Sequence, residues 1–131
     1  MQNSKESTVT LRLELFVRDL PGSIDFYCRV LGFEPGEQQR DGYTLVTNGE
    51  VQIGLNLLSN LREDHPIRPA AGERLGQGVE IVLEVSDVEE AYGRVKSQHW
   101  PLSTELKQRP WGLTDFRVLD PNGYYLRITS R

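Results

Sequence analysis

The stretch Leu11-Arg-Leu-Glu-Leu-Phe-Val-Arg-Asp19 decides the fold, because it recurs later in the chain as Val79-Glu-Ile-Val-Leu-Glu-Val-Ser-Asp87. Apolar and polar residues alternate in both stretches, and the first stripe extends back to Val9. Strict alternation is typical of a strand with one buried face. The two stretches therefore predict two copies of one structural unit, each beginning with a strand from its first apolar residue.

Each predicted strand ends at an aspartate that can cap a following helix. Glu90 stands three residues after Asp87, which is the spacing of a capping box, and Pro21 after Asp19 is tolerated in a first helical turn. Apolar residues then recur at helical spacing, at Leu20, Ile24, Tyr27 and Leu31 and again at Val88, Ala91, Tyr92 and Val95. Gly32 is expected to end the first helix.

A hairpin is predicted after each helix. The first runs over 42–57 with Asn48-Gly49 at its turn, and the second over 114–128 with Asp120-Pro-Asn-Gly123 at its turn. The order β-α-β-β-β is thus expected twice. We expect one domain over 1–131, with module one at about 8–58, a linker at 59–77 rich in Pro, Gly and charge, and module two at about 78–131. A linker of that length allows the modules to pair within one chain or between two chains.

Composition restricts the class of protein. The chain has 131 residues, a formal net charge of −4 and one cysteine, so an intrachain disulfide is excluded and a cytoplasmic location is expected. A net negative charge disfavours nucleic acid as a partner. No stretch has the roughly 18 apolar residues of a membrane span, and we expect no membrane partner.

Three segments carry a family resemblance. Val17-Arg-Asp-Leu20, Phe26-Tyr-Cys-Arg-Val-Leu-Gly-Phe33 and Asp120-Pro-Asn-Gly123 resemble signature segments of the glyoxalase / bleomycin-resistance / dioxygenase (vicinal-oxygen-chelate) superfamily. The resemblance covers Val9 to Ile128. Pro110-Trp-Gly112 before the last hairpin is similar to the bleomycin-resistance subgroup.

The resemblance implies an α+β fold in which two βαβββ modules form a curled mixed sheet around a cleft, with the helices on the convex side. The polar stripe of each first strand would then face the cleft. Residues expected to line it and to bind a ligand are Arg12, Glu14, Phe16, Gln52, Asn56, Glu80, Trp111, Tyr125 and Arg127. Trp111 offers a flat face for stacking on an aromatic ligand, or else packs on the cleft rim or a second subunit. Gly54 is expected to leave room for a ligand or another backbone.

The superfamily's enzymes hold a divalent ion at positions that correspond to Arg12, Glu80 and Arg127. A guanidinium has no lone pair to offer, so we expect no metal and no other cofactor. Arg12, Glu80 and Arg127 are instead expected to neutralise one another, either as a structural ion-pair cluster or as a site for an anionic or carbonyl-bearing ligand. A set built from Glu14, Glu80, Glu84 and Gln52 is the alternative metal site.

The resulting expectation is a metal-independent small-molecule-binding protein, as in bleomycin-resistance proteins that sequester a drug, working as a homodimer. The alternative is an enzyme, a glyoxalase-like lyase or a dioxygenase with a carboxylate metal site. A metal-free enzyme using a glutamate as general base and an accessory protein without a ligand also stay open. Catalytic residues and the identity of the ligand are not assigned by the sequence.

Overall fold

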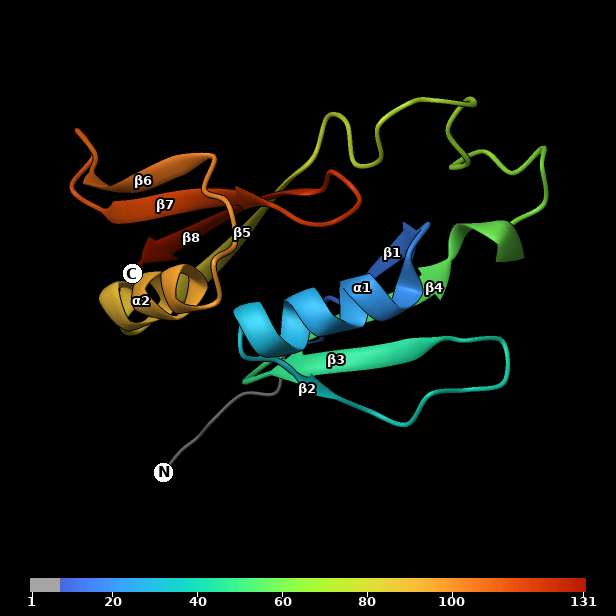
Figure 1. Ribbon diagram of the computed structural model, residues 1–131, viewed down its shortest axis with the longest axis horizontal. Helices are drawn as coiled ribbons and strands as arrows, with labels where there is room; N and C mark the ends of the chain where they lie inside the picture. Colours follow the sequence, from blue (N-terminus) through green and yellow to red (C-terminus); the bar gives the residue numbers. More distant parts are fainter. Residues whose placement is uncertain (1–7) are drawn as a thin grey trace.

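The computed structural model describes residues 8–131, and it contains two modules of the predicted order (Figure 1). The first module consists of β1 (Leu13–Val17), α1 (Leu20–Asp25), the π-helical η1 (Phe26–Val30), β2 (Glu34–Pro35), β3 (Thr44–Asn48) and β4 (Val51–Leu57). The second consists of β5 (Glu80–Val85), α2 (Val88–Ser97), β6 (Thr104–Gln108), β7 (Thr114–Leu119) and β8 (Tyr125–Ser130). Both βαβββ modules are therefore confirmed.

Each module forms its own four-stranded mixed sheet. The strand orders are β1-β4-β3-β2 and β5-β8-β7-β6, so the two sheets have the same topology. The first strand of each module pairs in parallel with the last, and the remaining pairs are antiparallel. β1 and β5 consequently lie at sheet edges, and within residues 8–131 the outer side of neither strand is paired with a further strand.

The predicted caps and turns explain where the elements begin and end. The Asp19 and Asp87 carboxylates accept hydrogen bonds at 3.0 Å from the backbone N–H groups of Gly22 and Glu90. Gly32, at φ +82°, ends the first helical segment as predicted. The two predicted hairpins form between β3 and β4 and between β7 and β8.

The two first strands are shorter than the apolar stripes predict. Val9 and Leu11 are 81% and 76% exposed, and Val79 is also exposed, whereas the strands begin at Leu13 and Glu80. The pairing of β1 with β4 begins only at Leu13, opposite Ile53, although β4 itself begins at Val51. Residues 8–12 are therefore not paired with any strand of the described residues 8–131.

One hydrophobic core joins the modules on the helix side of both sheets. It includes Val17 and Phe26 from the first module and Ile81 and Phe116 from the second. The Trp100 ring packs against the Phe26 ring, with the two ring centroids 4.8 Å apart. Because the helices and the shared core lie on one side of each sheet, the opposite faces of both sheets point away from that core (Figure 1).

Polar contacts reinforce this junction. The guanidinium of Arg94 on α2 donates to the backbone carbonyls of Arg29 and Cys28, at 3.1 and 3.2 Å.

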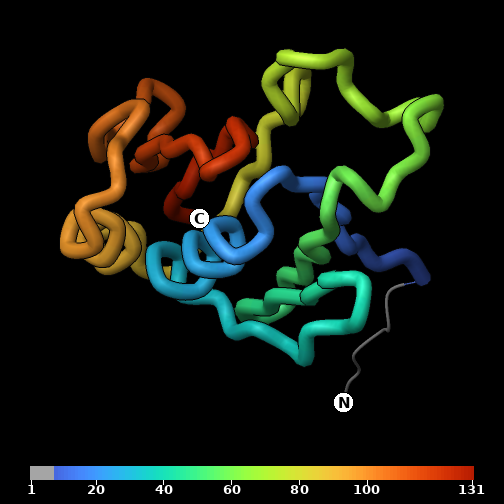
Figure 2. The backbone as a smooth tube through the Cα atoms, turned by 45° about the vertical axis from the view of Figure 1, so that its right-hand side comes forward, coloured from blue at the N-terminus to red at the C-terminus, as the bar shows by residue number. Residues whose placement is uncertain are grey.

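Between β4 and β5, the chain forms the short η2 (Leu58–Asn60) and then a loop over 61–79 that arches away from the sheets (Figure 2). Within residues 8–131 no helix is long and apolar enough to cross a membrane.

Candidate functional site

The first candidate surface is the face of the first sheet opposite α1, which we call the first polar face. It carries Glu14 and Phe16 of β1 with Gln52, Gly54 and Asn56 of β4. The sheet register places these residues side by side, since Glu14 is paired with Gly54 and Phe16 with Asn56. Five consecutive cross-strand pairs thus alternate between the core and this face.

Glu14 is the centre of the polar contacts on the first polar face. Its Oε2 accepts a hydrogen bond from the Tyr43 hydroxyl at 2.7 Å and lies 3.2 Å from Arg12 Nε. Burial and the hydrogen bond to Glu14 raise the pKa of Tyr43, so its hydroxyl stays protonated and remains a donor at neutral pH. Glu14 is therefore already engaged by two side chains of its own module.

Gly54 has a different role from the one predicted. A side chain at this position would collide with the carboxylate of Glu14 and the hydroxyl of Tyr43, which lie directly over it. The space above Gly54 is therefore filled by this hydrogen-bonded pair and is not left for a ligand. Glycine is needed because the pair crosses close over β4.

The other predicted residues of the first polar face differ in their freedom. Gln52 is exposed and Phe16 is half-buried. Asn56 uses its Oδ1 to accept hydrogen bonds from Asn60 Nδ2 at 2.8 Å and from the backbone N–H of Leu57. Asn56 therefore orients the end of β4, and Gln52 and Phe16 are the more accessible groups.

The second candidate surface is the face of the second sheet opposite α2, which we call the second polar face. It carries Glu80, Tyr125 and Arg127 of the predicted set, with Val82 and Glu84 also on β5. Glu80 lies opposite Tyr125 in the register, and its Oε1 is 3.2 Å from Arg127 Nη2.

The expected three-way charge cluster divides between the two faces. Arg127 pairs with Glu80 on the second sheet, whereas Arg12 pairs with Glu14 on the first. Both pairs are partly exposed, with side-chain exposure between 25% and 54%. The ion pair between Glu80 and Arg127 agrees with the prediction. The prediction that Arg12 joins this pair within one chain was wrong, because Arg12 pairs with Glu14 on the other sheet.

Three charged residues of the second polar face were missed from the sequence. Asp115 of β7 is fully buried, and its Oδ1 accepts a hydrogen bond from Arg109 Nε at 2.8 Å. Arg117, also on β7, lies directly opposite Arg127 of β8. The predicted turn at 120–123 contained the signal, because the register of a hairpin follows from its turn and brings residue 117 opposite residue 127.

Trp111 lies at the turn between β6 and β7. Its side chain is 56% exposed, and the adjacent Gly112 has φ +95°, which the turn requires. An exposed indole next to the second sheet is available for stacking on a planar molecule. The sequence predicted Trp111 as a ligand-binding residue, and the structure shows the turn on which it lies.

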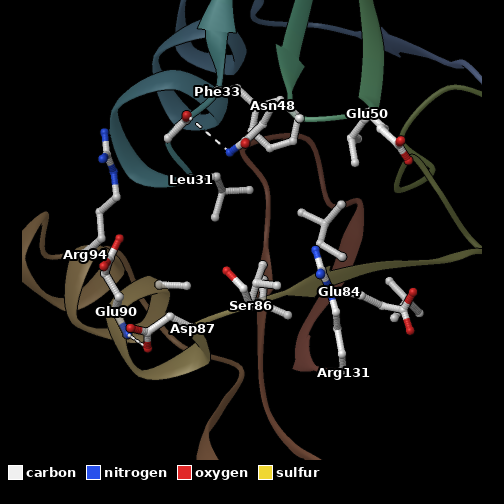
Figure 3. A pocket seen from close by; sticks show the side chains of 18 of the residues that line it. Leu31, Phe33, Asn48, Glu50, Glu84, Ser86, Asp87, Glu90, Arg94 and Arg131 are labelled. Atoms are coloured by element: carbon white, nitrogen blue, oxygen red, sulfur yellow. Dashed lines mark hydrogen bonds between the residues drawn. The ribbon is translucent and has the colours of Figure 1, made fainter.

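A hollow lies between the modules, and none of the nine predicted site residues lines it. It encloses about 880 Å³ between the end of η1, the β3–β4 turn, β5 and the start of α2 (Figure 3). Leu31 and Phe33 lie at one side, and Glu90 and Arg94 at another. Residues of β5 and charged residues at the rim line this hollow. We regard the two polar faces as the better ligand surfaces, because their charged side chains form ion pairs and hydrogen bonds with one another.

The side chains do not suit the divalent ion of the superfamily's enzymes. At the corresponding positions, Arg12 and Arg127 are cationic donors, and Glu80 is paired with Arg127. Within residues 8–131, no group of three or more His, Cys, Asp or Glu side chains is arranged to hold a metal. Of the alternative set, Glu14 and Gln52 lie on one sheet and Glu80 and Glu84 on the other.

Comparisons with known proteins agree on one family. The family described as "Glyoxalase/Bleomycin resistance protein/Dioxygenase superfamily" matches residues 10–128. A bleomycin resistance protein of Geobacillus stearothermophilus is 31% identical over 116 residues, covering 81% of this chain and 84% of the relative, and one of Staphylococcus aureus gives the same values.

Solved structures share the fold at lower identity. TioX from Micromonospora sp. ML1 has a TM-score of 0.73 at 21% identity, covering 92% of this chain and 98% of its own. A glyoxalase/bleomycin resistance protein/dioxygenase from Nocardioides has a TM-score of 0.76 at 22% identity, covering 96% and 85%. These two likenesses support the fold alone.

Proposed function

This chain belongs to the Glyoxalase/Bleomycin resistance protein/Dioxygenase superfamily, and from that premise we propose that it is a metal-independent small-molecule-binding protein of the bleomycin-resistance type. Its ligand is held between the polar faces of two chains in a homodimer. Aromatic stacking and charged side chains provide the contacts. Fold alone does not specify this role, so the support comes from the residues of the two faces.

The observation that carries the proposal is the make-up of the second polar face. It combines an aromatic ring, Tyr125, with the guanidinium of Arg127 and the exposed apolar side chain of Val82, which is 40% exposed. Ligand sites in proteins are typically apolar surfaces with a few well-placed polar groups. The indole of Trp111 adds a second aromatic group at the rim.

Metal independence follows from the chemistry of the side chains. A guanidinium stays protonated at usable pH and repels a divalent cation, and two of the three corresponding positions carry one. A Lewis-acid mechanism needs ligands that these positions do not offer. We therefore expect ligand affinity to be the same with and without a chelator.

The edges of the two sheets support a homodimer. Among residues 8–131, no further strand pairs with the outer side of β1 or β5, and the exposed Val9, Leu11 and Val79 lie next to the starts of these strands. An uncovered edge with apolar neighbours favours pairing with another chain. A second copy that covers both edges would place the first polar face of one chain beside the second polar face of the other.

Ligand binding is tested by isothermal titration calorimetry with a panel of planar, glycopeptide-like and charged compounds. Any compound that binds is then titrated into Trp111→Ala, which should weaken its binding by about tenfold if stacking contributes about 1.4 kcal/mol. The unfolding temperature should not change, because the indole is more than half exposed. Unchanged affinity for every compound would exclude the stacking role of Trp111.

The homodimer is tested by size-exclusion chromatography with light scattering. The expected mass is twice the 14.9 kDa of one chain. Val79→Lys, at the β5 edge, should convert the dimer to a monomer, because it places a charge where the second copy covers apolar surface. Ile67→Lys is the matched control, since Ile67 is 57% exposed in the 61–79 loop and lies outside both edges. A wild-type protein that is monomeric at micromolar concentration would contradict the shared cleft.

A further inference from the structure

We propose that the second polar face is an oxyanion site, in which Arg117 and Arg127 together bind a carboxylate or phosphate group of the small molecule. This inference rests on the proposed function and adds the chemical class of the ligand. It depends on three features of β7 and β8: the position of the two arginines, the carboxylates available to them, and their unpartnered donors.

The two guanidinium groups are direct cross-strand neighbours. Arg117 is the register partner of Arg127 in the antiparallel β7–β8 pair, and both side chains point away from the core, since Phe116, Val118, Leu126 and Ile128 on the same strands are buried in it. Side chains of such a pair have their Cβ atoms about 5 Å apart. Like charges at that position repel each other, and an anion bound between the two guanidinium groups is attracted by both.

The carboxylates of the face do not satisfy both arginines. Asp115 is bonded by Arg109 at 2.8 Å, and its other oxygen is 3.8 Å from Arg117, beyond hydrogen-bond distance. Glu80 pairs with Arg127 at 3.2 Å. Three arginines thus share two carboxylates, and the carboxylate that Arg117 pairs with, Asp115, is held more closely by Arg109.

Two further charges belong to this face and offset each other. Glu84 lies beyond Glu80 on β5, opposite Thr129, and Lys107 of β6 lies opposite Asp115. With both counted, the face carries four cations and three anions, in a chain whose formal net charge is −4.

Both arginines also have unused donors. The Nε atoms of Arg117 and Arg127 are buried and have no hydrogen-bond partner among residues 8–131. About a quarter of each side chain remains exposed, at 23% and 25%, so the outer nitrogens are within reach of a ligand. The fork of a guanidinium matches the two oxygens of a carboxylate or phosphate.

The surroundings of Arg117 favour a fixed position for its charge. The neighbouring Tyr125 phenol and the carboxylates of Asp115 and Glu80 raise the pKa of the Arg117 guanidinium, against the opposing effect of burial. The phenol ring of Tyr125 lies on the same face as Arg127, two residues along β8. An aromatic carboxylate could therefore place its ring near Tyr125 while its oxygens meet the arginines.

The experiment compares benzoate, its cationic counterpart benzylamine, and inorganic phosphate. Each is titrated calorimetrically into the full-length wild-type protein at constant ionic strength, with chloride as the balancing anion. We expect benzoate or phosphate to bind and benzylamine not to bind. Benzoate without phosphate would identify a carboxylate site, and phosphate without benzoate a tetrahedral oxyanion site. Binding of benzylamine with no response to either anion would overturn the oxyanion inference and leave the small-molecule role standing.

Variants connect the binding to the two arginines. Arg117→Gln and Arg127→Gln should each weaken anion binding by about tenfold or more, because each removes one charged fork. Arg117→Lys should recover only part of the affinity, since lysine keeps the charge and loses the fork. Arg40→Gln, in the exposed β2–β3 loop, is the matched control for net charge and should change affinity by less than about twofold.

Folding of each variant is checked by circular dichroism and thermal unfolding. Loss of Arg117 removes a repulsion and leaves Asp115 bonded to Arg109, so we expect Arg117→Gln to keep the wild-type fold. A folded Arg117→Gln protein with wild-type affinity for the anion would overturn the proposal, as would an equal loss in Arg40→Gln.

Discussion

The buried hydroxyl of Tyr27 is expected to contribute more to stability than any other single polar atom of the module junction. It donates a hydrogen bond to Asp120 Oδ2 at 2.9 Å, and Tyr27 is fully buried while Asp120 is 4% exposed. Among residues 8–131, the one other donor to that oxygen is Asn122 Nδ2, at a long 3.4 Å. Tyr27→Phe therefore leaves a buried carboxylate oxygen with one weak partner.

The size of the effect follows from this geometry. Phenylalanine keeps the ring, so no large cavity forms, and the loss is that of one hydrogen bond to a charged group, about 1.5–3 kcal/mol. Unfolding entropy of about 2.1 cal/mol/K per residue turns this into a decrease of about 5–10 °C in Tm for 131 residues. Urea denaturation at pH 7 gives the free energy of unfolding, and calorimetry gives Tm.

The pH dependence supplies a sharper test. Burial raises the pKa of the Asp120 carboxyl, against hydrogen bonds from Tyr124, Asn122 and Tyr27 that lower it. Because the pKa of Asp120 is raised in the folded state, the folded protein holds this proton more tightly than the unfolded chain does. The resulting stabilisation is greatest at acid pH and is lost as the pH rises through the folded-state pKa. Removing the Tyr27 hydroxyl raises this pKa further. The destabilisation by Tyr27→Phe should thus be smaller at pH 4 than at pH 7, because it grows as Asp120 loses its proton.

The control is Tyr43→Phe, which removes a hydroxyl bonded at 2.7 Å to Glu14, a carboxylate that is partly exposed. Water can replace that bond, so we expect a loss of less than about 1 kcal/mol. A Tyr27→Phe loss that is no larger than the Tyr43→Phe loss, or that is equal at pH 4 and pH 7, would refute the argument from the buried Asp120 charge.

Two further predictions concern the polar faces. Arg109→Met leaves the buried Asp115 without its closest cation. It should lower the free energy of unfolding, measured by urea denaturation, by about 3 kcal/mol. A decrease of less than about 1 kcal/mol would contradict this prediction. Gly54→Ala forces Glu14 and Tyr43 apart and should cost about 1–3 kcal/mol, again by denaturation. Adding Glu14→Ala should recover part of that cost, and an unchanged cost in the double variant would show that the strain lies elsewhere.

Much of the fold follows from local sequence. The alternation that ends at Asp19 and Asp87 predicts two equivalent strands with capped helices after them, and Asn48-Gly49 and the turn at 120–123 predict the hairpins. These signals act over a few residues, through backbone preferences and short-range hydrogen bonds, so they can be read without knowing the tertiary structure.

The site depended more on non-local contacts. The sequence indicated which stripe of each strand faces away from the core, and that placed Glu80 beside Arg127. It did not indicate that Arg12 pairs with Glu14. An arginine side chain is long enough to reach several carboxylates, and the fold sets the distances that decide which one it pairs with. It likewise gave no reason to connect Arg109, which precedes the last hairpin, with the buried Asp115.

The amino-acid sequence by itself determined the repeat, the caps, the turns and the family resemblance, because each is encoded in neighbouring residues. The start of each first strand, the contacts above Gly54 and the sharing of Asp115 between Arg109 and Arg117 depend on the tertiary structure. Those outcomes depend on how far two neighbouring strands pair and on side chains brought together from distant positions. The alternation continues through Val9 and Leu11, but a strand extends only as far as a neighbouring strand pairs with it.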